Sequence, residues 1–319
     1  MPTIQSRARI EDPAITSRQC LAKELRMRAP LITSLFAGLA VVTACESQLA
    51  ATIAAPAAPA LALTCFRENG HAMLAAHRGG PAAGYPENAL SSLQRLADLG
   101  VLYAEIDVRR SVDGTLFLLH DDTLDRTTTG QGDAEGQDWS ELSGFQLRDN
   151  DGQLTEERIP TLADAVNIAR VNGVILNLDL KSVHAAEIVS FIHDHDARDL
   201  VAIIAYTVDD AAALHALDPG LVLSVPNELA ALAAAGVNLE TSYIWLGTGA
   251  IDASADAALA GQGLESSAGL FRREDGSAEP YLEARAAGIE LLSIDNVDAA
   301  VAALGGSAQL KDQIATCAP

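Results

Sequence analysis

The sequence predicts an α/β fold, specifically a (β/α)8 TIM barrel with a small inserted hairpin after its second strand. Short apolar runs alternate with Ala- and Leu-rich stretches of helical periodicity along residues 67–319. Runs that are apolar throughout are typical of parallel strands covered by helices on both faces. About eight such repeats favour a closed barrel. An open doubly wound sheet is the alternative, which the absence of a G-x-G-x-x-G sequence after any predicted strand disfavours.

The predicted strands and helices follow one another in order. Seven strands are clear apolar runs, and an eighth near Gly269–Arg272 is weak. The clear runs are Met73–Ala76, Leu102–Val108, Val174–Leu180, Leu200–Ala205, Leu221–Val225, Ser242–Leu246 and Glu290–Ile294. Several helices carry end signals, such as Thr161 before one and Gly100 after another. The predicted helices are Asn88–Leu99, Leu162–Val171, Val183–His195, Asp209–Leu217, Glu228–Ala235, Pro280–Ala287 and Val297–Leu304.

A polar, glycine-rich segment at residues 121–157 interrupts this alternation. It is too long for an ordinary connection between a strand and a helix. Asp113-Gly114 favours a tight turn, so Leu116–Leu119 is predicted to pair with the preceding strand as a hairpin. We expect the insert to fold over the barrel mouth and to form part of the substrate wall.

Residues 1–44 have the pattern of an export signal. A basic segment ending at Arg28 precedes an uncharged run, Ala29–Cys45, that is too short to span a bilayer comfortably. The end of this run resembles a bacterial lipoprotein cleavage box, which predicts a membrane tether through lipidated Cys45. An ordinary signal peptide with an incidental cysteine is the alternative. Met27 is a more usual start for such a signal, and residues 1–26 would then be an artefact of start-site choice. Both interpretations predict that the protein is exported. It would then be located in the bacterial cell envelope, as a periplasmic protein or a membrane-anchored lipoprotein, or be secreted.

Residues 45–66 are rich in alanine and are interpreted as an Ala/Pro-rich tether before a barrel domain at residues 67–319. A short helix packed on that domain is the alternative. Cys65 and Cys317 lie at the two ends of the predicted domain. An exported protein permits disulfides and barrels commonly bring their ends together, so a Cys65–Cys317 bridge is predicted, with two free buried thiols as the alternative.

The 319-residue chain is strongly acidic, with a formal net charge of −22 at pH 7. Nucleic acids and anionic lipid surfaces attract Lys- and Arg-rich proteins, so this charge argues against both as general partners. Hydrophobic residues make up 49% of the chain, which is enough for a sizeable core.

Histidines and carboxylates follow several predicted strands at the point where each strand ends. His77 ends the first strand, Glu105 and Asp107 lie late in the second, and Asp179 lies late in the third. Glu105 and Asp107 face the same side because strand side chains alternate, and they repel unless a cation lies between them. The carboxyl ends of barrel strands meet at one mouth, so these residues are expected in one site.

At these positions the sequence resembles the glycerophosphodiester phosphodiesterase family. The resemblance is close from about Met73 to Lys181 and looser elsewhere. It is carried by His77-Arg78-Gly79, Pro86-Glu87-Asn88, Glu105-x-Asp107, Asp113-Gly114, His120-Asp121, Leu124-x-Arg126-Thr127-Thr128, Gly130-x-Gly132, Pro160-Thr161-Leu162 and Asp179-Leu180-Lys181. So many ordered pieces are far more specific than one short motif.

The resemblance implies metal-dependent hydrolysis of small-molecule glycerophosphodiesters to glycerol 3-phosphate and an alcohol. Glu105, Asp107 and Asp179 are expected to bind one divalent cation, either Ca²⁺ or Mg²⁺, because these ions prefer carboxylate oxygens. The family usually has glutamate where Asp179 stands, and aspartate is one methylene shorter.

His77 and His120 are the implied acid/base pair, since imidazole can take or give a proton near neutral pH. The sequence does not show which histidine plays which part. Arg78 and Lys181 are expected to bind the phosphate oxygens.

Two further residues are expected to support the site. Asn88 is predicted to cap the first helix, and Glu87 to be a metal ligand or an acceptor behind the ligands. Arg126 is predicted to form a structural salt bridge within the inserted segment, with binding of the phosphate oxygens as the alternative.

Two other functions remain as alternatives. A lysophospholipid or phospholipid phosphodiesterase could use the same site, but the sequence has no aromatic-rich amphipathic patch for membrane insertion. A non-catalytic envelope binding protein is disfavoured because both histidines and all three carboxylates are present. The family's Trp-Thr strand has no counterpart in the C-terminal half, so the head group stays open.

Overall fold

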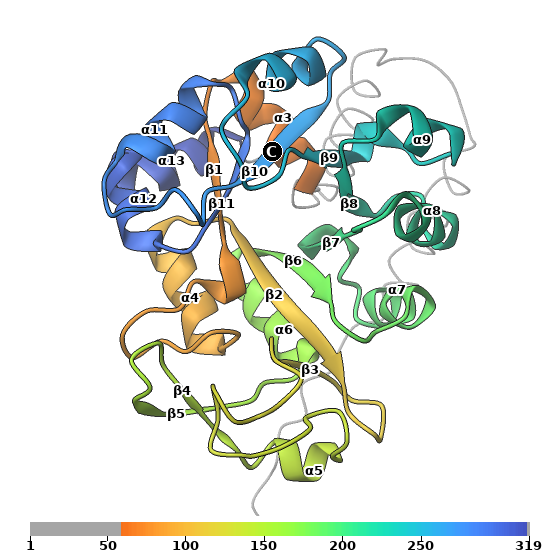
Figure 1. Cartoon of the computed structure of the whole chain (residues 1–319), viewed down its shortest axis with the longest axis vertical. Coiled ribbons are helices and arrows are strands. Elements are labelled where there is room, and N and C mark those ends of the chain that lie inside the picture. Colours follow the sequence, from red (N-terminus) through yellow and green to blue (C-terminus); the bar gives the residue numbers. More distant parts are fainter. Residues whose placement is uncertain (1–58, 318–319) are drawn as a thin grey trace, which may run out of the picture. The chain divides into compact units, whose positions relative to one another are not determined.

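Eight parallel strands close into a barrel in the computed structural model, which describes residues 59–317 (Figure 1). They follow the order β1-β11-β10-β9-β8-β7-β6-β2, and pairing of β1 with β2 closes the ring. The strands are β1 (Met73–Ala76), β2 (Tyr103–Arg110), β6 (Ile175–Leu180), β7 (Val201–Ile204), β8 (Val222–Pro226), β9 (Ser242–Trp245), β10 (Glu265–Gly269) and β11 (Leu291–Ile294). The predicted (β/α)8 barrel is confirmed.

Helices surround the strands and cover the outer face of the barrel (Figure 1). Thr161 and Thr207 each cap a helix through a capping box, with Asp164 and Asp210 respectively. The helices are α4 (Leu90–Leu99), α6 (Leu162–Asn172), α7 (Ala185–Asp194), α8 (Val208–Leu217), α9 (Leu229–Ala234), α10 (Ala253–Ala260), α11 (Glu279–Ala286), α12 (Val297–Ala303) and α13 (Ser307–Cys317). Between residues 59 and 317, none of them combines the length and the apolar character that a membrane crossing requires.

The eighth strand was misplaced by the sequence pattern. It was predicted near Gly269–Arg272, whereas β10 spans Glu265–Gly269 and is buried throughout. Its first three residues are polar, so no apolar run marks it. These polar groups can be buried because they are hydrogen-bonded. Thr64 donates to Glu265 at 2.8 Å, and the Ser266 hydroxyl contacts the carboxylates of Asp256 and Glu290.

For residues 59–66 the structure contradicts the tether and confirms the alternative, a short helix packed on the barrel domain. Pro59–Glu68 is a helix, α3, which buries Leu63 and Phe66 against side chains inside the barrel. Those side chains include the first residues of several strands, so α3 closes the N-terminal end of the barrel. A Cys65–Cys317 disulfide joins α3 to α13, as one of the two sequence alternatives predicted. The predicted signal, Cys45 and the rest of the tether lie outside the described residues.

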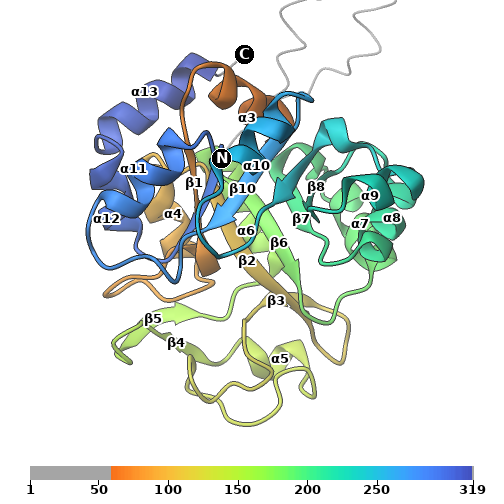
Figure 2. The same ribbon diagram turned by 45° about the horizontal axis from the view of Figure 1, so that its top comes forward.

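The inserted segment has its own small core. As predicted, β3 (Leu116–Leu118) pairs antiparallel with β2. The remainder contains α5 (Trp139–Leu142) and an antiparallel hairpin of β4 (Gln146–Arg148) and β5 (Leu154–Arg158), which the sequence did not indicate. Their apolar side chains pack around Phe117, Leu119, Leu124, Leu142 and Leu147. Figure 2 shows this insert and α3 at opposite ends of the barrel.

Candidate active site

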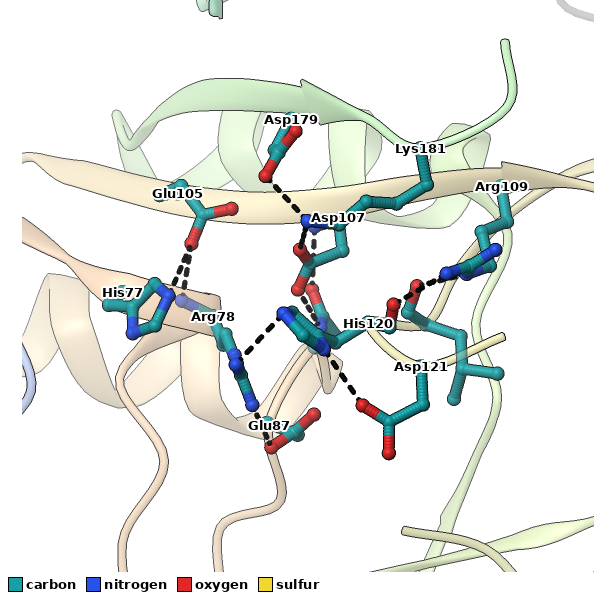
Figure 3. Close-up of polar contacts among 12 residues, drawn as sticks. His77, Arg78, Glu87, Glu105, Asp107, Arg109, His120, Asp121, Asp179 and Lys181 are labelled. Carbon is teal, nitrogen blue, oxygen red and sulfur yellow. Dashed lines mark hydrogen bonds and ion pairs between the residues drawn. The ribbon is translucent and has the colours of Figure 1, made fainter. Parts of the chain in front are cut away.

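The carboxyl ends of β1, β2 and β6 bring the predicted residues together (Figure 3). The register of β2 and β6 places Asp107 directly beside Asp179, and Glu105 lies two residues earlier on the same face of β2. His77 begins a short 3-10 turn, His77–Gly79, as soon as β1 ends. The closed parallel sheet therefore gathers residues that lie far apart in the sequence.

Glu105, Asp107 and Asp179 form what we call the carboxylate cluster. All three side chains are buried, and one oxygen of each lies within 4.8 Å of the others. Within residues 59–317, Glu105 Oε1, Asp107 Oδ1 and Asp179 Oδ1 have no hydrogen-bond partner. Burial, together with the charge of Asp107, raises the pKa of Glu105 well above its usual range. Converging carboxylate oxygens without hydrogen-bond donors, in a buried site, fit a hard divalent cation.

Uncharged donors orient two members of this cluster. The backbone N–H of Arg78 donates to Glu105 Oε2 at 2.7 Å. The Asn88 side-chain amide donates to Asp107 Oδ2 at 2.7 Å, and its oxygen accepts from the Asp107 backbone N–H at 2.9 Å. The predicted helix cap at Asn88 is therefore wrong. The helix α4 begins at Leu90, and Asn88, in a left-handed conformation with φ of 56°, turns its amide to the cluster instead.

His77 lies between two carboxylates. Its Nδ1 is 2.7 Å from Asp295 Oδ1, and its Nε2 is 3.9 Å from Glu105 Oε2. The ring also packs against Phe271, with 4.7 Å between ring centroids. Asp295 directly follows β11, and the sequence analysis did not identify it as a site residue.

His120 lies between a carboxylate and a guanidinium. Its Nδ1 is 2.8 Å from Asp121 Oδ1, and its Nε2 is 2.8 Å from Arg78 Nη2. A guanidinium can only donate, so Nε2 is the acceptor and the ring proton is assigned to Nδ1, facing Asp121. The buried Arg109 side chain holds this loop by donating to the His120 carbonyl oxygen at 2.7 Å.

Glu87 is the centre of an arginine network. Arg126 donates to both of its carboxylate oxygens, at 2.8 and 2.9 Å, and Arg78 lies 3.3 Å away. Burial alone would raise the pKa of Glu87, but the two arginines outweigh it and lower that pKa. Arg126 also binds Asp121 and lowers the pKa of that carboxyl well below its usual range. Glu87 is thus an acceptor behind the cluster, and Arg126 forms the predicted structural salt bridge.

Lys181 joins two members of the cluster. Its Nζ lies 2.6 Å from Asp179 Oδ2 and 2.9 Å from Asp107 Oδ1, the latter as an ion pair without hydrogen-bond geometry. Burial would lower the pKa of Lys181, but these carboxylates raise it overall, so the amine is charged. Lys181 therefore brings positive charge to the cluster, whereas the Arg78 guanidinium contacts His120 and Glu87.

A cavity of about 190 Å³ opens beside His77, Glu105 and Asp179. The sequence did not assign its lining, because the side chains come from five further strand ends. Its wall consists mainly of aromatic and hydroxyl side chains, namely Tyr206, Ser224, Tyr243, Trp245, Ser267, Phe271 and Ser293. The insert does not line this cavity, contrary to expectation. It borders an open depression with Arg109 and Lys181 instead, through residues 120–123.

Comparisons with known proteins match the barrel fold and a stretch of sequence that contains the carboxylate cluster. The model of the glycerophosphoryl diester phosphodiesterase family matches residues 77–232. A glycerophosphodiester phosphodiesterase of Caldanaerobacter subterraneus is 32% identical over 111 residues, which are 34% of this chain and 45% of that relative. The match thus spans less than half of this relative's length.

Two solved structures resemble the whole barrel. A glycerophosphoryl diester phosphodiesterase from Parabacteroides distasonis has a TM-score of 0.67 at 25% identity, over 78% of this chain and 87% of that one. A phosphodiesterase from Oleispira antarctica, solved with its product sn-glycerol-3-phosphate, has a TM-score of 0.62 at 22% identity, over 75% of this chain and 98% of that one.

Proposed function

Because the chain belongs to the glycerophosphoryl diester phosphodiesterase family, we propose that it hydrolyses glycerophosphodiesters to glycerol 3-phosphate and an alcohol. The observation that carries this proposal is the buried carboxylate cluster, in which one oxygen of each residue has no hydrogen-bond partner among the described residues, together with His77 beside Glu105. The named activities of the relatives and the product bound by the Oleispira antarctica enzyme support it.

Glu105, Asp107 and Asp179 would hold one divalent cation, Ca²⁺ or Mg²⁺. Such an ion, when bound, withdraws negative charge from the phosphate. Lys181 and Arg78 carry charge that pairs with carboxylates and with His120 in the free protein. A phosphate at the cluster would give both side chains a better partner, because charge-assisted hydrogen bonds to phosphate are strong.

We assign the base to His120 and the acid to His77. His120 Nε2 carries a lone pair, so it can take the proton of the attacking oxygen while Asp121 holds the proton on Nδ1. His77 takes the opposite part, because Asp295 lies 2.7 Å from its Nδ1 while its Nε2 lies on the side of Glu105 and the cavity. His77 Nε2 can then give its proton to the leaving alcohol oxygen, and the two transfers balance.

The size of the cavity favours a small head group. A volume of about 190 Å³ suits a water-soluble diester better than a lipid with acyl chains. This favours glycerophosphodiesters over intact or lysophospholipids. We further propose that the protein is exported to the cell envelope, which the Cys65–Cys317 disulfide supports because such bonds persist in oxidising compartments.

The test is release of glycerol 3-phosphate from glycerophosphocholine by the purified protein, with Ca²⁺, Mg²⁺ or EDTA. Release should require a metal and should fall by roughly 10²–10⁴-fold in His77→Ala and in His120→Ala. His193→Ala is the matched control, since that imidazole is exposed on α7 and pairs with Asp218. Metal binding without hydrolysis of this or any other glycerophosphodiester would instead favour the lipid-phosphodiesterase or binding-protein alternatives.

A further inference from the structure

Tyr206 connects the rim of the cavity to the carboxylate cluster. It lies two residues after the end of β7, and 65% of the residue is exposed to solvent. Its hydroxyl nevertheless donates to Asp179 Oδ2 at 2.8 Å, although Asp179 is only 6% exposed. Nothing in the amino-acid pattern around Tyr206 indicated this contact.

The hydrogen bond completes a regular arrangement around the cluster. One oxygen of Glu105 is held by the Arg78 backbone N–H, and one oxygen of Asp107 by the Asn88 amide. Tyr206 does the same for Asp179. In each case the donor is uncharged and the second oxygen has no hydrogen-bond partner within residues 59–317.

Lys181 also contacts Asp179 Oδ2, but it holds this carboxylate less rigidly than Tyr206 does. Its ammonium lies at the end of a flexible four-carbon stem and also pairs with Asp107. We expect the phosphate of a bound substrate to compete with both carboxylates for this ammonium. Tyr206 reaches Asp179 through a rigid ring with two side-chain torsions, so its hydroxyl fixes the plane of the carboxylate.

We propose that Tyr206 is a positioning residue of the metal site, which holds Asp179 through Oδ2 and so fixes the place of this carboxylate beside Glu105 and Asp107. The proposal rests on the metal-binding part of the proposed function. Partners that orient metal ligands typically change metal affinity or activity by about 10- to 100-fold when they are removed. The Tyr206 ring also lines the cavity, so the substitution Tyr206→Phe isolates the hydroxyl while leaving that wall in place.

The experiment is a calorimetric titration of the purified protein with Ca²⁺ and with Mg²⁺, without substrate. Tyr206→Phe should weaken metal binding about 10-fold. The matched control is Tyr243→Phe, because that hydroxyl lies in the same cavity but donates to the Asn177 amide oxygen at 3.0 Å and not to a carboxylate. Its metal affinity should equal that of the unmodified protein.

A second readout separates positioning from substrate binding. The metal concentration for half-maximal hydrolysis should rise about 10-fold in Tyr206→Phe, and the full rate should return at saturating metal. Unchanged metal affinity in Tyr206→Phe, an equal loss in Tyr243→Phe, or a rate deficit that persists at saturating metal would each overturn the proposal. Because the titration needs no substrate, a protein that binds metal without hydrolysing diesters would refute the proposed activity alone.

Discussion

At the scale of single residues, the site depends on which hydrogen-bond partner each polar atom has. Each imidazole has a carboxylate on Nδ1, yet His77 Nε2 faces a carboxylate and His120 Nε2 faces a guanidinium. In the proposed mechanism these different partners prepare the same side chain for opposite proton transfers. The proposed assignment of acid and base therefore rests on the partners of the two histidines.

Asp295 provides the residue-scale prediction. Asp295→Ala removes the partner of His77 Nδ1, so hydrolysis should fall about 10- to 100-fold, a part of what general acid–base catalysis contributes. Metal affinity should stay the same, because Asp295 contacts no member of the cluster. Asp298→Ala is the control, since this nearby exposed carboxylate pairs with Arg95 and, among residues 59–317, with no other basic side chain. A variant at Asp295 with the full rate would show that His77 needs no such partner.

At the scale of elements, a buried carboxyl pair attaches α10 to the barrel strands. Ser266 Oγ on β10 lies 2.7 Å from Asp256 Oδ1 and 3.0 Å from Glu290 Oε2. One hydroxyl hydrogen cannot satisfy two ionised carboxylates, so we expect one of the two carboxyls to be protonated and to donate to Ser266 Oγ. Burial, with the charges of Asp256 and Glu265, raises the pKa of Glu290 to about 7.

This pair predicts a pH-dependent stability. A raised folded-state pKa gives stabilisation that is complete below the usual value near 4.5 and is lost as the pH rises through about 7. Glu290→Gln should flatten the curve of thermal stability against pH and gain on the order of 3 kcal/mol over the unmodified protein at pH 8. Glu283→Gln, on the outer helix α11, is the control. Parallel curves for Glu290→Gln and the unmodified protein between pH 5 and 8 would contradict this account.

At the scale of the whole molecule, the candidate site and the helix that covers the barrel floor lie at opposite ends of the barrel. The carboxylate cluster occupies the carboxyl ends of the strands, whereas α3 packs against side chains at their other ends. Salt bridging of Arg67 to Glu265 at 2.9 Å and the disulfide hold α3 in place. The stability of the barrel can therefore change without rearranging the site.

The disulfide gives the whole-molecule prediction. It joins residues 252 apart in sequence, so its loss enlarges the unfolded ensemble. The Cys65→Ser, Cys317→Ser double variant should lose about 2–5 kcal/mol of stability, measured by denaturant unfolding. Its activity well below the melting temperature should be retained. Reducing agent should lower the stability of the unmodified protein but not of the double variant; equal stability of the two oxidised proteins would contradict the prediction.

The sequence by itself determined the barrel, the place of seven strands and the residues of the cluster. Periodicity records whether a strand is buried, and Glu105, Asp107 and Asp179 are recognisable because carboxylates at the ends of apolar runs serve no packing purpose. The disulfide was one of two alternatives that the positions of Cys65 and Cys317 allowed.

Only the tertiary structure decided the features that depend on partners distant in sequence. The strand β10 has a polar sequence, and its buried polar groups are satisfied by hydrogen bonds to α3, to α10 and to Glu290, the residue before β11. The amide of Asn88 does not cap the helix, because Asp107 on strand β2 binds it instead. Asp295 lies 218 residues from its partner His77, and Tyr206 lies 27 residues from its partner Asp179. Local propensity carries no information about such contacts, which exist only once the barrel has closed.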